Sequence, residues 1–193
     1  MRLTPLRDES AEQAHLRARL LRQRGGVHGP FEVLLRSPAL GDPLERLSTS
    51  CLAESALPPR LRELTLLTVA RLLDAQHSWL AHVEKGRAAG LDPAALDRLA
   101  RGEDPGFVPR DERLLHRFVH QALTRHFVDD DTYAAAHGEF GEAALVDLTV
   151  SLGTFAALAL LLNVFQVDLP PDATPPFPDV TAFPPGRRTP SSR

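Results

Sequence analysis

The chain has 193 residues, with 22 Lys and Arg against 25 Asp and Glu, 43% hydrophobic residues and a single cysteine, Cys51. This length is typical of one domain with one hydrophobic core, and scattered charges of both signs argue against a nucleic-acid surface. One cysteine excludes an internal disulfide framework, a cysteine-rich zinc site and a two-thiol redox cycle within one subunit. The N-terminal segment is charged throughout and has no apolar core typical of a secretory signal, so we expect a cytoplasmic protein.

Helix-forming residues dominate up to residue 169, where Ala, Leu, Arg and Glu are abundant and no stretch alternates with a period of two. The sequence therefore predicts an all-α fold. Capping residues, glycines and prolines mark the expected helices. In chain order these are 10–24, a short apolar turn at 31–35, 43–55, 59–73, 75–89, 93–101, 111–127, a helix from 130 that ends at Gly138 or Gly141, and 142–167.

The break at Asp74 matters most for function. The chain is apolar almost all round before Asp74, and Asp is a favoured helix N-cap, so we expect one helix to end near Leu73 and another to begin at Ala75. Without this break, Glu63 and His82 would lie about 28 Å apart on one straight helix. With it, the chain folds back and the two side chains can meet.

The last predicted helix contains the apolar run LTVSLGTFAALALLLNVF. Asp147 and Asn163 bracket only 15 residues of it, which is fewer than the roughly 18 to 20 that a membrane span needs. We interpret this helix as a core helix or one buried between subunits, and we expect no membrane span.

Proline marks the one clear boundary, because eight of the 17 prolines lie in the last 24 residues. Such a segment cannot form a helix or a central strand. We therefore expect a helical domain over 1–169 and an extended or disordered Pro-rich tail over 170–193.

Glu63, Ser78 and His82 form the most informative group of polar residues. Glu63 stands among leucines, so its carboxylate needs a polar partner. A carboxylate that is hydrogen-bonded to an imidazole fixes the tautomer of that imidazole, which can then act as a general acid or base. Ser78 and Trp79 precede His82 by four and three residues and so project in neighbouring directions. Amide groups of residues 75–77, at the predicted helix start, are expected to attract an anion. The simpler interpretation is structural, with His82 and Trp79 as core residues.

The order of several short motifs resembles the carboxymuconolactone decarboxylase family, which includes alkyl hydroperoxidase D. The motifs are Pro-Arg-Leu-Arg-Glu-Leu, Leu-Leu-Thr-Val-Ala, Trp79-x-x-His82, Gly90-Leu91 and a late Asn163 before Phe165. The resemblance covers roughly 31–169. It implies an alkyl hydroperoxidase D-like helical bundle that assembles as a homo-oligomer, a trimer or hexamer, with the site near a subunit interface.

Departures from the family pattern direct the functional prediction. The peroxidase branch has a Glu, a Cys twelve residues later, a second Cys three further on and a His four beyond; counted from Glu63, Ala75 and Ser78 occupy the cysteine positions. Serine and alanine cannot cycle through a disulfide. The decarboxylase branch often has Tyr-Glu-Trp-x-x-His, where this chain has His77 and Ser78 before the matching Trp79 and His82.

The resemblance therefore implies cofactor-free acid/base chemistry on a small anionic lactone or carbonyl compound. In this interpretation Glu63, His82 and His77 are catalytic, Ser78, Trp79 and Ala75 bind the substrate, and no metal takes part. Two alternatives stay open: a peroxidase that uses Cys51, and a non-catalytic ligand-binding oligomer.

Three further features carry less weight. His116 and His120 have the i, i+4 spacing of a metal pair, but arginines share their face, so we expect a solvated polar surface. Ser78 lacks the G-x-S-x-G turn of a hydrolase nucleophile. His28, in a Gly-rich loop, is an additional candidate for the site.

Overall fold

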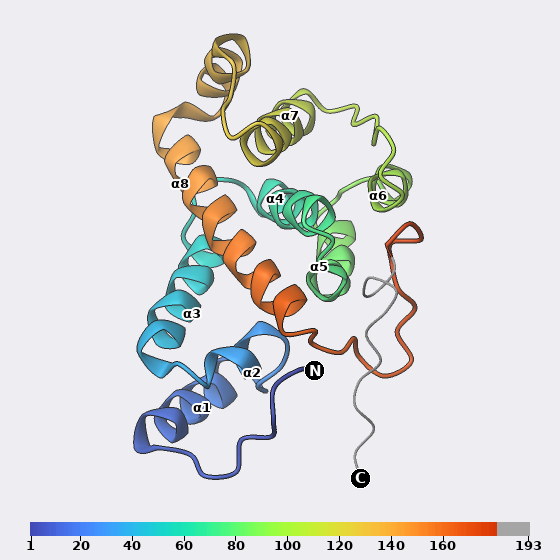
Figure 1. Cartoon of the computed structure of the whole chain (residues 1–193). Coiled ribbons are helices and arrows are strands. Elements are labelled where there is room, and N and C mark those ends of the chain that lie inside the picture. The colour runs from blue at the N-terminus through green and yellow to red at the C-terminus, as the bar shows by residue number, and fades with distance from the viewer. Residues whose placement is uncertain (181–193) are drawn as a thin grey trace.

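The computed structural model describes residues 1–180, and these residues form eight α-helices and no strand (Figure 1). The predicted all-α class is therefore confirmed. The helices are α1 (Ala11–Arg24), α2 (Pro30–Leu34), α3 (Pro38–Ala53), α4 (Pro59–Leu72), α5 (Gln76–Ala88), α6 (Pro93–Ala100), α7 (Arg110–Thr124) and α8 (Asp130–Val164).

Helix α4 lies at the centre of the fold. It packs against α5, α7 and α8, while α3 runs beside α8, and α1 and the short α2 lie at one end of the molecule (Figure 1). Residues 64–70 of α4 are buried on every side, which explains why this helix is apolar almost all round.

Local signals place several helix ends correctly. Ser10 caps α1 and forms a capping box with Gln13, and Gly25 closes the same helix in the left-handed conformation. Gly141 interrupts α8 with φ of 78°, between the two helices predicted on either side of it. The start of α3 was predicted wrongly: the helix begins at Pro38 rather than Pro43. Pro38 occupies the first helical position, which favours proline, and Pro43 lies inside the helix, where its missing amide removes one helical hydrogen bond.

Helix α8 is the one helix within residues 1–180 that is long and apolar enough, by length and composition, to cross a membrane. Half of its most apolar window is buried inside the protein. Its buried face includes Leu148, Leu152, Phe155 and Leu158, which belong to the main core. The core helix of a globular domain meets the same criteria.

The C-terminal segment is non-helical through residue 180, and its remainder, 181–193, lies outside the described residues. It is nevertheless part of the core, because Phe177 is only 1% exposed. The Phe177 ring meets Trp79 edge to face with centroids 5.3 Å apart, and the Arg71 guanidinium lies 5.0 Å from the centroid of the same ring. Arg71 also pairs with Asp179 at 2.7 Å. Helix α8 ends at Val164, and the irregular chain that follows it still contributes Phe177 to the hydrophobic core.

Candidate active site

The turn between α4 and α5 reverses the chain, as the sequence predicted. Asp74 makes this turn with φ of 53°, and the Ala75 amide donates to the Ala70 carbonyl at 2.7 Å. The Asn163 side chain donates to the Leu73 carbonyl at 2.6 Å and so ties the turn to α8.

Two details of the turn correct the sequence analysis. The N-cap of α5 is Ala75, and the Asp74 carboxylate pairs with Arg71 instead of capping the helix. The amides of Ala75 and Gln76 donate to carbonyls within the turn, so these two amides are not free to attract an anion.

Chain reversal brings Glu63 of α4 to His82 of α5. Glu63 Oε2 lies 2.8 Å from His82 Nδ1, and the two side chains are 14% and 15% exposed, so the pair is sheltered yet within reach of solvent. Gly86 lets the helices approach closely at this level, because a Cβ there would lie 2.9 Å from Leu67 Cδ1. With the carboxylate ionised, Nδ1–H donates to Glu63 and the other ring nitrogen, Nε2, stays available to accept a proton.

His82 lines a cavity of about 230 Å³ that is enclosed by α1 to α5 and α8. Glu63 is not among its lining residues, so the carboxylate supports the imidazole from behind. The polar part of the wall consists of Arg24, His28, Ser48, His77, Ser78, His82 and Lys85. The apolar part consists mainly of Phe31, Leu52, Leu66, Val69, Phe155, Leu158 and Leu162.

The predicted site residues separate into two groups. His77, Ser78 and His82 share the cavity wall. Trp79 and Ala75 do not line this cavity: Trp79 is 3% exposed and packs on Phe177, and Ala75 is fully buried in the main core. The predicted substrate contacts of Trp79 and Ala75 therefore have no counterpart in the wall of this cavity.

His77 is the second imidazole that faces the cavity from α5. Burial lowers its pKa, and the neighbouring His28 lowers it further, so His77 is neutral at neutral pH. The loop before α2 makes room for the ring: Gly29 has φ of 62°, and a Cβ there would lie 2.7 Å from His77 Cε1. A neutral imidazole in this position can donate or accept a proton.

Residues outside the recognised motifs complete the cavity. His28, predicted from the sequence only as an additional candidate, lines it from the loop between α1 and α2. Lys85, the only lysine in the chain, stands one helical turn after His82, a spacing that was visible in the sequence. Arg24, from the end of α1, had no sequence signal, because only folding brings α1 to this place.

Within residues 1–180, no group of three or more His, Cys, Asp and Glu side chains is arranged to hold a metal ion. His116 and His120 lie away from the cavity, in an open cleft beside α7. Their surface is not fully solvated as predicted, because the His116 ring packs edge to face on Phe107, with centroids 5.5 Å apart. Burial lowers the pKa of His116 to about 4.

The helical arrangement defines an all-α protein with the alkyl hydroperoxidase D-like fold. A solved structure of a protein of unknown function from Agrobacterium tumefaciens, proposed to be the antioxidant defence protein AhpD, superposes with a TM-score of 0.62. The superposition covers 72% of this chain and 95% of that one, at 18% sequence identity. Residues 38–116, which contain Glu63 and His82, match the carboxymuconolactone decarboxylase family, so the predicted family is confirmed for this segment. Among curated proteins, none matches this chain.

Proposed function

We propose that the protein catalyses proton transfer at the carbon beside a carbonyl group in a small anionic lactone or related compound, without a bound cofactor. The observation that supports this best is the 2.8 Å contact between His82 and Glu63 at the wall of an accessible cavity. An imidazole oriented in this way is a suitable general acid or base near neutral pH.

His82 Nε2 is the atom that exchanges the proton. In an isomerisation of an unsaturated lactone, Nε2 removes a proton from a carbon conjugated with the carbonyl to give a dienolate, and protonated His82 returns the proton to the other carbon end of that dienolate as the C=C bond moves. In a decarboxylation, the bond to the carboxylate carbon breaks, CO₂ leaves with the electron pair remaining on the enolate, and protonated His82 delivers the proton to carbon. Neutral His77 is placed on the same wall to donate a hydrogen bond to the developing enolate oxygen.

A thiol peroxidase mechanism has less support. Ser78 and Ala75 stand at the two cysteine positions of the peroxidase motif. The one thiol, Cys51, is 8% exposed on α3 and is not among the residues that line the cavity. Hydroperoxide reduction that persists in Cys51→Ser would show that this thiol plays no part in such an activity.

His82→Gln tests the acid/base proposal. We expect turnover of carboxylated γ-lactones or β-keto acids, followed by NMR in D₂O, to fall by about 10²- to 10⁴-fold, the usual contribution of a general acid or base. His15→Gln is the matched control, because His15 is exposed on α1 and does not line the cavity. Glu63→Gln should lower kcat more than it raises KM, because it disturbs the orientation of the imidazole and not the binding surface. Unchanged turnover in His82→Gln would refute the proposal, and ligand binding without turnover in the wild type would favour a non-catalytic binding protein.

We also propose that the chain forms a homo-oligomer. Val146, Val150, Leu160 and Val164 are large apolar side chains that α8 leaves exposed within residues 1–180, and exposed apolar patches often mark subunit contacts. Light scattering at micromolar concentration tests this, and a monomer would exclude it.

A further inference from the structure

The polar wall of the cavity is entirely basic or neutral. Arg24, His28, His77, His82 and Lys85 line it, and no Asp or Glu within residues 1–180 does so. A partly enclosed cavity with charge of one sign attracts ions of the opposite sign. The electrostatics therefore favour an anionic ligand.

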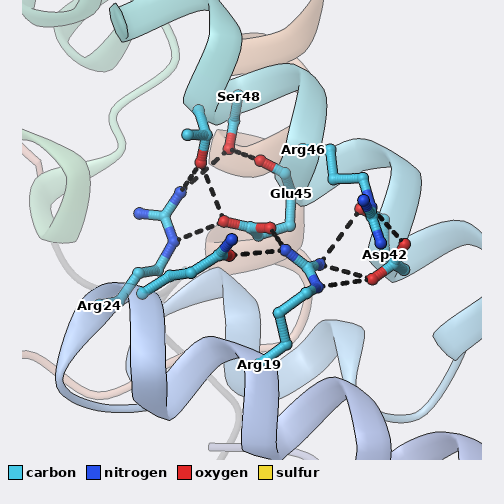
Figure 2. A network of polar contacts seen from close by, with 8 residues as sticks. Arg19, Arg24, Asp42, Glu45, Arg46 and Ser48 are labelled. Carbon is cyan, nitrogen blue, oxygen red and sulfur yellow. Dashed lines mark hydrogen bonds and ion pairs between the residues drawn. The ribbon is translucent and has the colours of Figure 1, made fainter.

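Within residues 1–180, Arg24 is the cationic side chain of this wall that hydrogen bonds and an ion pair hold in place. Its Nε donates to Glu45 Oε1 at 2.9 Å, and its Nη2 donates to Thr49 Oγ1 at 2.9 Å (Figure 2). Its guanidinium lies 4.0 Å from the centroid of the Phe31 ring. Within residues 1–180, Nη1 donates to no acceptor. One edge of a fixed guanidinium is thus left for a ligand.

Glu45 is the acceptor that fixes Arg24. Its side chain is 1% exposed and pairs with Arg19 as well as with Arg24 (Figure 2). Burial opposes its ionisation, but hydrogen bonds from the two arginines hold the pKa of Glu45 below its usual value. Since Arg19 satisfies part of this carboxylate, Arg24 is not required to neutralise it alone.

The rest of the wall is apolar and large enough for a hydrocarbon body. Residues of α2, α3, α4 and α8 form this part, among them Phe31, Leu52, Leu66 and Phe155. An apolar cavity of about 150 Å³ is sufficient to bind benzene, and this cavity measures about 230 Å³. A compact ligand with several charges would make few apolar contacts with this surface. Its charges would also lose their hydration without gaining hydrogen bonds from the protein in return.

We propose that the cavity binds small monocarboxylates with an apolar body about the size of a six-membered ring, and that Arg24 recognises the carboxylate. The inference rests on the proposed function in that both use the same cavity, but it concerns binding and not proton transfer. Arg24 lies outside the segment 38–116 that matches the family. Recognition by Arg24 is therefore a contribution of the N-terminal helix of this chain.

Calorimetry with cyclohexanecarboxylate and the neutral cyclohexanecarboxamide tests the proposal. The wild type should bind the carboxylate at least tenfold more tightly than the amide, on the scale of a charge-assisted hydrogen bond. Arg24→Gln should weaken carboxylate binding by about 10- to 100-fold and leave amide binding within twofold. Arg22→Gln, on the same helix and outside the cavity wall, removes an equal charge and should change neither affinity.

Three results would overturn the proposal. The first is equal affinity of the wild type for the two compounds, or no binding of either. The second is unchanged carboxylate affinity in Arg24→Gln. The third is equal loss of both ligands in Arg24→Gln, which would make Arg24 a structural residue. Carboxylate binding that is retained in His82→Gln separates this proposal from the catalytic one. Recognition of the carboxylate by Arg24 would then be supported whether or not the protein shows turnover.

Discussion

Phe177→Ala tests whether the Pro-rich segment is part of the folded core. A buried Phe removes about 200 Å² from water, which corresponds to roughly 5 kcal/mol at about 25 cal/mol per Å². Ordering an irregular segment offsets part of this gain. Because Phe177 is 1% exposed and contacts Trp79 and Arg71, we expect the free energy of unfolding to fall by about 3 kcal/mol, at the lower end of the range for Phe→Ala in a core.

Urea denaturation followed by circular dichroism and fluorescence measures this loss. With a slope of about 2 to 3 kcal/mol per M, the midpoint should fall by about 1 to 1.5 M. Trp79 is the only tryptophan, so its emission reports directly on this contact and should shift to longer wavelength as water reaches the ring. Phe127→Ala is the matched control, because Phe127 is 80% exposed, and it should cost less than about 0.5 kcal/mol. An unchanged midpoint and emission in Phe177→Ala would refute the docking of this segment.

Two further predictions concern histidines. Burial lowers the pKa of His116 to about 4, and it also lowers the pKa of His77. Below about pH 6.5 the unfolded chain therefore binds more protons than the folded chain. The free energy of unfolding should decrease as pH falls from 6.5 toward 4, by up to about 3 kcal/mol from His116. His116→Phe should flatten that slope in denaturation curves, and an unaltered slope would show that His116 titrates normally. Gly25 and Gly29 both have positive φ. A Cβ on Gly29 would collide with the His77 ring, at 2.7 Å from Cε1, whereas a Cβ on Gly25 would meet no atom of residues 1–180 within 4 Å. Gly25→Ala should cost about 1 to 2 kcal/mol of stability and leave turnover unchanged, while Gly29→Ala should also lower turnover at least tenfold; equal turnover in the two variants would contradict the role of His77.

Helix ends set by neighbouring residues were the most predictable part of the fold. The Ser10 cap, the glycine after α1 and the break at Gly141 each depend on residues within one helical turn. Asp74 shows where this reasoning fails. Its carboxylate has the chemistry of an N-cap, but it pairs with Arg71, and the turn is held partly by Asn163, 90 residues from the carbonyl that it binds.

The candidate site divides in the same way. Glu63 and His82 could be paired from the sequence, because a break in an apolar helix and the family spacing both bring them together. Trp79 precedes His82 by three residues and was expected on the same side of the helix, yet it packs on Phe177 instead of lining the cavity. A helix presents several faces within four residues, and only its packing partners decide which face meets a cavity.

The sequence by itself determined the helical class, the family of the segment 38–116, the Glu63 to His82 pair and the loss of the thiol pair, because these depend on composition and short spacings. Tertiary structure alone decided that Arg24 shares a cavity with His82 and that Phe177 belongs to the core. Both contacts join segments distant in sequence. Their formation depends on the burial of apolar surface and the pairing of buried charges throughout the folded chain, which no local pattern records.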